Sequence, residues 1–469
     1  MDRKKQKIAL MRKYASSYKV LGMGGMEISL EDKFFKTSMQ IAIPVSLQAM
    51  LQSSFSMIDQ VMVGQLGTSQ IAAVEIGGKP GFVFNFVAGA VATITGIMVS
   101  QYIGKKDEKS VQKSLSVNLL TVTVIAAIFF ALCLAFPENI AEIFTKDNAV
   151  LNEAGLYIRT MSVTFLLSGI GIVLAVMIRC RNKAKYPLYI SAVSAIVNTG
   201  LNWIFIFGHF GFDAMGVQGA AFASIIGQVV NVALMILVFF KINGKFHFSI
   251  NLGKSETIQY FAMLMPVVLS ELLWTIGQNV NTYIYGHMGT KELAGMSMTG
   301  PVQGLMIGML SGLSQAAGIL IGKRLGEKEY EKAYRESVLL CIYGLIGSLV
   351  LSAMLIILRG VYADLYNVEA DVHSIGSALL LAFAVLAPVK VENMILGGGI
   401  IRSGGRTKYI MFIDVLGTWC VGVPLGIITG IVLHMPIVWV YFILSQEELV
   451  RLIISIVMFR KRKWMNTLE

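Results

Sequence analysis

Residues 44–73 read PVSLQAMLQSSFSMIDQVMVGQLGTSQIAA, and residues 266–295 read PVVLSELLWTIGQNVNTYIYGHMGTKELAG. A shift of 222 residues superimposes the two stretches without a gap, and the register continues to residues 110 and 332. It gives 13 identities in 67 positions, whereas unrelated apolar sequences would give about five. The excess falls on glycine and proline, which fix backbone geometry. The chain therefore contains a duplicated unit.

The composition excludes a soluble protein. Of 469 residues, 55% are hydrophobic and 14% charged, whereas soluble globular domains carry roughly 25% charged residues. A coiled coil and a disordered chain are excluded with it. One spanning helix needs about 20 apolar residues, so the length accommodates roughly twelve spans and no large soluble domain. Because no two of the four cysteines are closely spaced, they predict neither a disulfide framework nor a zinc site.

Hydropathy predicts an all-α integral membrane protein with twelve transmembrane helices. Apolar segments separated by charged or glycine-rich breaks lie near residues 37–63, 80–103, 115–136, 157–179, 187–208, 216–240, 258–285, 301–322, 337–358, 375–401, 409–433 and 436–459. Twelve spans place 32 Lys and Arg residues on one side and four on the other. The positive-inside rule then places both termini in the cytoplasm. A wrong number of helices would have distributed the Lys and Arg residues over both sides of the membrane.

The repeat divides the spans into two six-helix halves. Because six is even, both halves enter the membrane from the same side, so the repeats are parallel and a pseudo-twofold axis runs along the membrane normal. This is the architecture of a rocking secondary transporter. We expect five regions. They are a basic cytoplasmic arm (1–36), an N-terminal half (37–240), a cytoplasmic linker (241–257), a C-terminal half (258–459) and a cytoplasmic tail (460–469).

The motifs resemble those of the multidrug and toxic compound extrusion family. They comprise the first-span pattern from Pro44 through Asp59 to Gly67, its echo in the second half, GVQGAAFAS at 216–224 and IRSGGRT at 401–407. Their order across about 37–459 carries the resemblance. It implies a polyspecific exporter of organic cations and drugs, with a MATE-type fold, that uses proton or sodium antiport and needs no cofactor. We expect a monomer in the bacterial plasma membrane that does not bind nucleic acid.

The resemblance also implies cation-coupling residues. The acid of the family's first span maps to Asp59, and its Asn/Asp pair in the fifth span maps to Asn198 and Asn202. Asn202 stands where many relatives carry the second acid, so proton transfer through a carboxylate pair is in doubt. In other branches an acid of the seventh span carries coupling, and Glu271 matches it. A sodium ion at Asp59 or Glu271 is the expected metal.

Buried polar residues support these assignments and leave alternatives open. Charge inside a bilayer costs roughly 2.5 to 3.5 kcal/mol on insertion scales, so each such group needs a partner or a role. Asn198 and Asn202 share a helix face and can serve a cation, Asp59 or a simple interhelical hydrogen bond. Lys390 and Glu392 form a secondary polar site in which the two cannot face each other. We expect Lys390 to pair with Glu271 or Asp59.

Three further features have structural interpretations. Asp414 lies near the cytoplasmic end of its span, and we expect it to anchor the GGRT loop. Glycines at every fourth position predict close helix packing; they are Gly304, Gly308, Gly312 and Gly318, Gly322, Gly326. Pro44 and Pro266, at matching depths, are candidate hinges because each removes a backbone hydrogen bond.

Other functions are weaker interpretations. The sequence has no phosphate-binding G-x-x-x-x-G-K-[ST] loop, so ATP is not the expected energy source. Its five histidines are scattered and form no H-E-x-x-H motif, so it is not expected to be an enzyme. No re-entrant filter pattern suggests a channel. A flippase for lipid-linked precursors keeps the fold and remains the alternative function, although such proteins tend to have a strongly basic central cavity.

Overall fold

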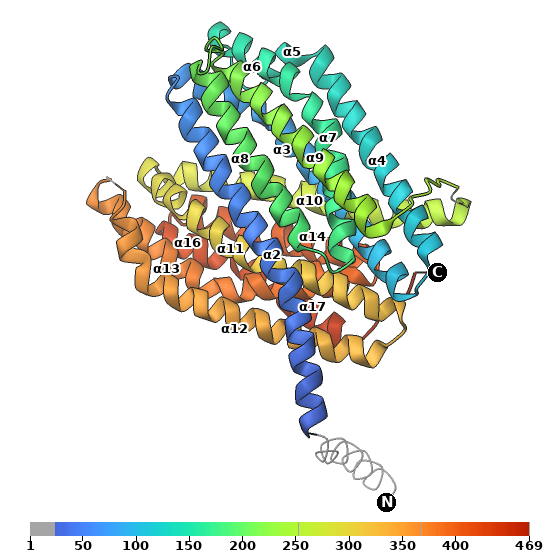
Figure 1. The fold of residues 1–469 in the computed structure, drawn as a ribbon. Coiled ribbons are helices and arrows are strands. Elements are labelled where there is room, and N and C mark those ends of the chain that lie inside the picture. Colours follow the sequence, from blue (N-terminus) through green and yellow to red (C-terminus); the bar gives the residue numbers. More distant parts are fainter. Residues whose placement is uncertain (1–23, 252, 367, 469) are drawn as a thin grey trace, which may run out of the picture.

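The structure, a computed structural model, describes residues 24–251, 253–366 and 368–468, with side chains from residue 32 onward. The described part of the N-terminal half is helical, with α2 (Gly24–Gly64), α3 (Thr68–Gly104), α4 (Glu108–Ala135), α5 (Pro137–Glu142), α6 (Asn148–Met161), α7 (Val163–Cys180), α8 (Lys185–Phe207) and α9 (Val217–Asn243). These helices form one bundle, coloured blue to green in Figure 1.

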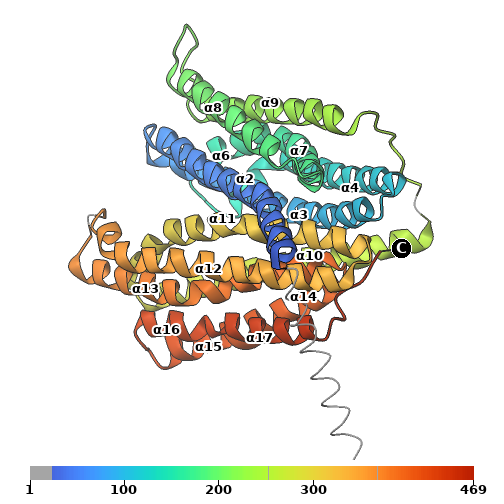
Figure 2. The ribbon, with the colours of Figure 1, turned by 60° about the horizontal axis from the view of Figure 1, so that its bottom comes forward.

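The C-terminal half forms a second bundle, coloured yellow to red in Figure 1. Its α-helices are α10 (Lys254–Met288), α11 (Thr290–Gly326), α12 (Tyr330–Ala363), α13 (Ala370–Asn393), α14 (Thr407–Val415), α15 (Val423–Ile427), α16 (Ile437–Leu444) and α17 (Gln446–Arg460). Three π-helical segments continue these helices, namely η1 (Met394–Ile401), η2 (Leu416–Gly422) and η3 (Ile428–Val432). Figure 2 shows the two bundles stacked against each other along α2, α3 and α11.

The predicted all-α membrane fold is confirmed. Within the described residues, 11 segments are long and apolar enough to span a membrane, and these include α13 with η1 and α14 through η3 as single passes. The segment predicted at 436–459 makes the twelfth pass as α16 and α17, which meet at Ser445. It falls outside the apolar set because the turn at Ser445 divides it into helices of 8 and 15 residues, each too short to span a membrane alone.

Helix α2 begins earlier than the span predicted at residue 37. Its first turns contain Glu, Leu, Asp and Lys, which support a helix without being apolar enough to register as a span. Hydropathy therefore located only the apolar part of a longer helix. Residues 1–23 of the predicted basic arm lie outside the described residues.

The halves meet through a reciprocal glycine contact. Gly104 in the last turn of α3 lies against the carbonyl oxygen of Lys323 in α11, and Gly326 lies against the carbonyl oxygen of Gln101 in α3. At both positions a Cβ atom would overlap that oxygen. In the 222-residue register Gly104 corresponds to Gly326 and Gln101 to Lys323, so the two contacts are related by the pseudo-twofold axis. We call this end of the molecule, with loops 105–107 and 327–329, the basic end.

The glycine rows on α11 are only partly packing faces. Gly312 lies against the carbonyl oxygen of Ala42 in α2, and Gly322 lies against the hydroxyl of Ser100. Gly304, by contrast, has no atom within 4 Å of the Cβ position. Within the first row, Gly312 therefore packs closely on α2, and the contact loosens towards Gly304 as the halves separate.

The segment predicted as a cytoplasmic tail packs across both halves at the basic end. Trp464 is fully buried. The Gln101 amide donates to the carbonyl oxygens of Ser403 (2.7 Å) and Asn466 (3.2 Å), and its oxygen accepts from the backbone N–H of Leu468 at 2.7 Å. One N-half side chain thus connects the C-half to the tail. These hydrogen bonds reinforce the glycine contact that joins α3 and α11 at the basic end.

We expect Gly326→Ala to destabilise this closed arrangement, because the new methyl group forces α3 and α11 apart. Overpacking of this kind typically costs about 1 to 3 kcal/mol. The matched control is Gly304→Ala on the same helix, which faces open space and should be neutral or slightly stabilising. Thermal unfolding of the purified proteins measures both effects. Equal melting temperatures for the two variants would contradict the closure.

Candidate functional site

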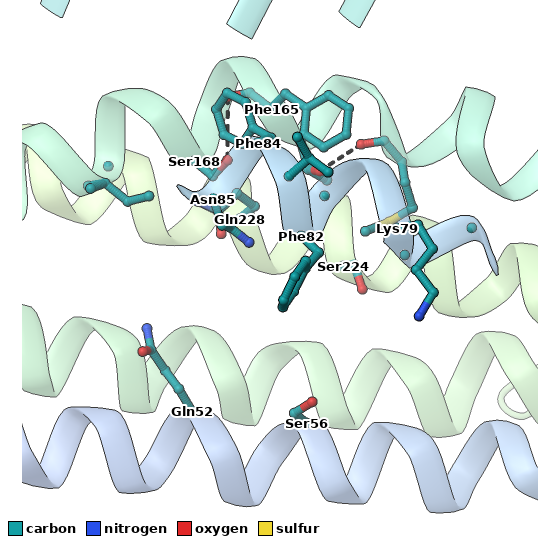
Figure 3. Close-up of a pocket in the computed structure, with 18 of the residues that line it drawn as sticks. Gln52, Ser56, Lys79, Phe82, Phe84, Asn85, Phe165, Ser168, Ser224 and Gln228 are labelled. Atoms are coloured by element: carbon teal, nitrogen blue, oxygen red, sulfur yellow. Dashed lines mark hydrogen bonds between the residues drawn. The ribbon is translucent and has the colours of Figure 1, made fainter. Parts of the chain in front are cut away.

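A cavity of about 1550 Å³ lies between the halves. Its walls carry many uncharged polar side chains, among them Gln52, Ser56, Asn85, Gln228, Asn231 and Gln278. Figure 3 shows Gln52 and Ser56 on α2 projecting into it from one side and Phe82 and Lys79 on α3 from the other. Amides, hydroxyls and aromatic rings can contact many kinds of small molecule, so the lining suits an adaptable binding site.

Arg179 closes the cavity towards the basic end. Its guanidinium donates to Gln315 in the C-half at 2.6 Å and to Gln48 in the N-half at 2.7 Å, and all three residues line the cavity. This arginine therefore links the halves at the cavity floor. The sequence analysis missed this role because Arg179 is in the last turn of α7 and reads as one of several loop cations.

Three predicted coupling residues come together in the N-half. Asp59 lies near the end of α2, and Asn198 and Asn202 project from one face of α8. The Asn202 amide donates to Asp59 Oδ1 at 2.7 Å. With its amide group in the orientation that satisfies both its oxygen and its nitrogen, Asn198 donates to both Asp59 oxygens at 3.2 Å. Neutral amides thus surround the carboxylate, and no basic group forms an ion pair with it among the described residues.

We call Asp59, Asn198 and Asn202 the Asp59 group. One residue, Ser224, lies between this group and the cavity. In the same orientation of its amide, the Asn198 oxygen accepts from the backbone N–H of Ser224 at 3.2 Å, and Ser224 lines the cavity. Ser224 is the last residue of the GVQGAAFAS motif. This motif therefore contacts Asn198 through the backbone of Ser224. Asn202 Oδ1 is buried without a hydrogen-bond partner, in a residue only 1% exposed. It is a free oxygen beside a carboxylate.

Glu271 has a partner other than the one predicted. Its carboxylate lies 3.5 Å from Arg402 of the IRSGGRT motif, so the proposed pairing with Lys390 is wrong in this conformation. Asp59 does not contact Lys390 either, since Asn202 and Asn198 occupy its oxygens. The sequence interpretation placed Arg402 in a loop, whereas η1 continues α13 and brings this arginine to α10.

Lys390 and Glu392 do not form one site. Lys390 lines a smaller cavity of about 260 Å³ in the C-half, together with Glu447 and Glu448. Glu392 faces α12 instead, beside Cys341 and Gly344. Their separation follows from the spacing, because residues two apart on a helix point in different directions. Hydropathy alone could not show which neighbouring helix each would meet.

A buried cluster around Arg451 was absent from the predicted site. Arg451 on α17 is 6% exposed, lies within 3.8 to 4.0 Å of Asp414, Glu447 and Glu448, and donates to the hydroxyl of Thr418. The spacing of Glu447 and Glu448 from Arg451, four and three residues, is a readable ion-pair signal. The sequence analysis assigned no role to Arg451.

Asp414 belongs to this cluster and not to the GGRT loop. Its carboxylate accepts from the hydroxyl of Ser270 on α10 at 2.5 Å and faces Arg451. The expected anchoring of the loop is therefore wrong. The loop is held instead by Thr407, whose hydroxyl donates to the carbonyl oxygen of Met263 at 2.8 Å.

The candidate hinges lie inside continuous helices. Pro44 is within α2 and Pro266 is within α10. Neither residue interrupts its helix, so a role in bending remains a prediction.

Two repeated helical halves around a polar cavity form the architecture of a membrane transporter. The sequence model of the MatE family matches residues 44–204 and 266–428, one segment in each half. The chain belongs to this family, whose members are transporters and not enzymes.

Curated relatives agree over nearly the whole chain. The chain is 25% identical over 461 residues to the probable multidrug resistance protein NorM of Pasteurella multocida, covering 91% of this chain and 94% of the relative. It is 22% identical over 440 residues to the uncharacterized transporter YisQ of Bacillus subtilis, covering 90% and 93%.

Solved structures share the fold. A variant of the Vibrio cholerae MATE transporter VcmN matches with a TM-score of 0.85 at 16% identity, covering 93% of this chain and 99% of the other. A MOP superfamily transporter from Pyrococcus furiosus matches with a TM-score of 0.82 at 17% identity, covering 91% and 95%.

We expect Arg451→Met to destabilise the protein, because it leaves three carboxylates facing one another inside the C-half. Breaking a buried ion-pair network from one side typically costs about 3 to 5 kcal/mol. The control is Arg159→Met, which removes a half-exposed pair with Glu138 and should cost at most about 1 kcal/mol. Thermal unfolding in detergent compares the two. Similar melting temperatures would show that the Arg451 cluster does not stabilise the fold.

Proposed function

We propose that this chain is a secondary active multidrug exporter, which expels organic cations and drugs in exchange for protons or sodium ions. Three features support the proposal: the family, the multidrug resistance names of relatives such as NorM, and a large cavity lined mostly by amides, hydroxyls and aromatic rings. The basic end faces the cytoplasm of a bacterial cell under the positive-inside rule. We propose that the protein works as a monomer.

The proposal rests above all on the Asp59 group. A carboxylate held only by neutral amides can release or accept a proton, or bind a sodium ion, without first breaking an ion pair. The unpartnered oxygen of Asn202 supplies a second ligand of the kind that hard cations prefer. Glu271 is the weaker coupling candidate because Arg402 already balances its charge.

The cycle that we propose is alternating access. The glycine contacts and the tail close the basic end, and the Arg179 bridge forms the floor of a cavity on the opposite side. Binding of an ion at Asp59 alters the contacts between α2 and α8, and Pro44 gives α2 a place to bend. The halves then rock and expose the cavity to the cytoplasm.

The lipid-precursor flippase is less well supported. Among the described residues of the central cavity the basic groups are Lys79 and Arg179. Lys79 is paired with Glu75 at 2.5 Å, and Arg179 is held by two amides. A cavity in which Arg179 carries the one positive charge not balanced by an acid, among the described residues, is poorly suited to a pyrophosphate-linked lipid.

We expect Asp59→Asn to abolish gradient-driven efflux of a fluorescent organic cation from proteoliposomes, because an amide cannot exchange a proton and binds sodium weakly. Imposing pH and sodium gradients separately identifies the coupling ion. The matched variant is Glu271→Gln, which we expect to retain at least about half of the wild-type rate.

Two results would contradict this assignment. Full activity of Asp59→Asn would remove Asp59 from coupling, and loss only in Glu271→Gln would move the coupling site to the C-half. If neither gradient drives efflux by the wild type, drug antiport fails as a function.

A further inference from the structure

The tail, residues 461–468 of the described chain, is anchored on the C-half. Trp464 is fully buried, and its ring stacks on that of Phe459 with the ring centroids 5.6 Å apart. Phe459 stacks in turn on Tyr334 of α12, at 4.6 Å. The guanidinium of Arg462 lies 4.4 Å from the centre of the Tyr334 ring. Because these contacts are buried and aromatic, they hold the first part of the tail to the C-half.

The other end of the tail crosses to the N-half. The backbone N–H of Leu468 donates to Gln101 Oε1 at 2.7 Å, and its carbonyl oxygen accepts from Lys105 Nζ. The Leu468 side chain is 2% exposed and lines a small pocket together with Met98 and Tyr102 of α3. Figure 1 shows this end of the chain beside α4 of the N-half. One segment is thus anchored on one half and held by the other.

The repeat identifies a counterpart of the tail in the linker that follows α9. Helices α4 and α12 begin at Glu108 and Tyr330, which correspond in the 222-residue register. The linker lies on α4, where the backbone N–H of His247 donates to Gln112 Oε1 at 3.3 Å. The residue that corresponds to Gln112 is Tyr334, on which the tail lies. Each segment therefore follows the last pass of its own half and packs on the equivalent helix.

The two segments differ in how they join the halves. The linker continues into α10, so it connects the halves covalently and stays connected in every conformation. The tail is held to the N-half by hydrogen bonds and by the burial of Leu468, which can be broken. Gln101 lies one turn from Gly104 on α3, so it leaves the tail whenever the glycine contact at the basic end opens. A contact that exists in only one of two conformations shifts the equilibrium towards that conformation.

We propose that the tail is a latch, which stays on the C-half and releases α3 each time the basic end opens. While it is closed, it stabilises the conformation in which the cavity lies away from the basic end. The strength of its contact with Gln101 and Lys105 then sets how much of the protein has an open basic end. This inference rests on the alternating access of the proposed function, and it adds the segment that controls the equilibrium between the two conformations.

The distance between the halves at the basic end tests the latch. Spin labels replace Lys109 and Lys332, exposed residues in the first turns of α4 and α12. The four native cysteines are replaced, and the protein is measured in lipid nanodiscs by double electron–electron resonance without substrate or gradient. Deletion of residues 465–469 removes the part held by the N-half and keeps the Trp464 anchor. We expect it to raise the ratio of open to closed protein at least about fivefold.

A control and a second variant keep the test decisive. Lys463→Ala changes an exposed residue of the same segment and should leave the distances unchanged. Leu468→Ala should raise the open fraction by a smaller factor, about twofold, and it replaces the deletion if thermal unfolding shows that the deleted protein is not folded. Wild-type distances in folded Leu468→Ala and in the folded deletion would overturn the latch.

This measurement is separable from the efflux assay because it uses neither substrate nor gradient. A shift towards the open basic end, without driven efflux by the wild type, would retain the latch and reject the antiport function. Driven efflux with unchanged distances in the tail variants would retain the antiport function and reject the latch.

Discussion

The close approach of α3 and α11 at the basic end determines the arrangement of the rest of the molecule. Gly104 and Gly326 each meet a backbone carbonyl of the partner helix, and no residue larger than glycine fits at either position. Because the two contacts are related by the repeat, the helices cross at the pseudo-twofold axis. A crossing at one end makes the halves diverge towards the other, and this divergence creates the central cavity. The Gln101 side chain and the buried tail then seal the crossing.

The two halves stabilise their buried charged groups in different ways. In the N-half a single carboxylate, Asp59, is satisfied by neutral amide donors, so its charge is not cancelled. In the C-half Asp414, Glu447 and Glu448 gather around one arginine, so three carboxylates share a single positive charge. Unbalanced charge in a low-dielectric interior responds strongly to a proton or a metal ion. The arginine of the C-half cluster also joins two helices, since Arg451 on α17 faces Asp414 on α14.

Much of the fold was predictable because it depends on local patterns. Spans follow from apolar runs, and the two halves from glycine and proline in register. The Asp59 group was predictable too, since Asn198 and Asn202 share a helix face and the resemblance placed Asp59 beside them. The partners of Glu271, Lys390 and Asp414 depend instead on how α10, α13 and α17 pack. No periodicity encodes that packing, so Glu271 met Arg402 and Asp414 met Arg451 against expectation.

Positions 59 and 281 are equivalent in the repeat, but one is an aspartate and the other an asparagine. This difference affects where an ion and a substrate would bind. Two identical halves would offer the same acid on both sides of the axis, and an ion and a cationic drug would compete equally at each. Here one half has a carboxylate with amide donors, and the other has an amide beside a mixed cluster of acids and lysine. Under the proposed function the ion binds at Asp59 in the N-half, and the substrate binds in the cavity between the two halves. Rocking about the shared glycine crossing then couples the two events, because neither half can move without changing the contacts of the other.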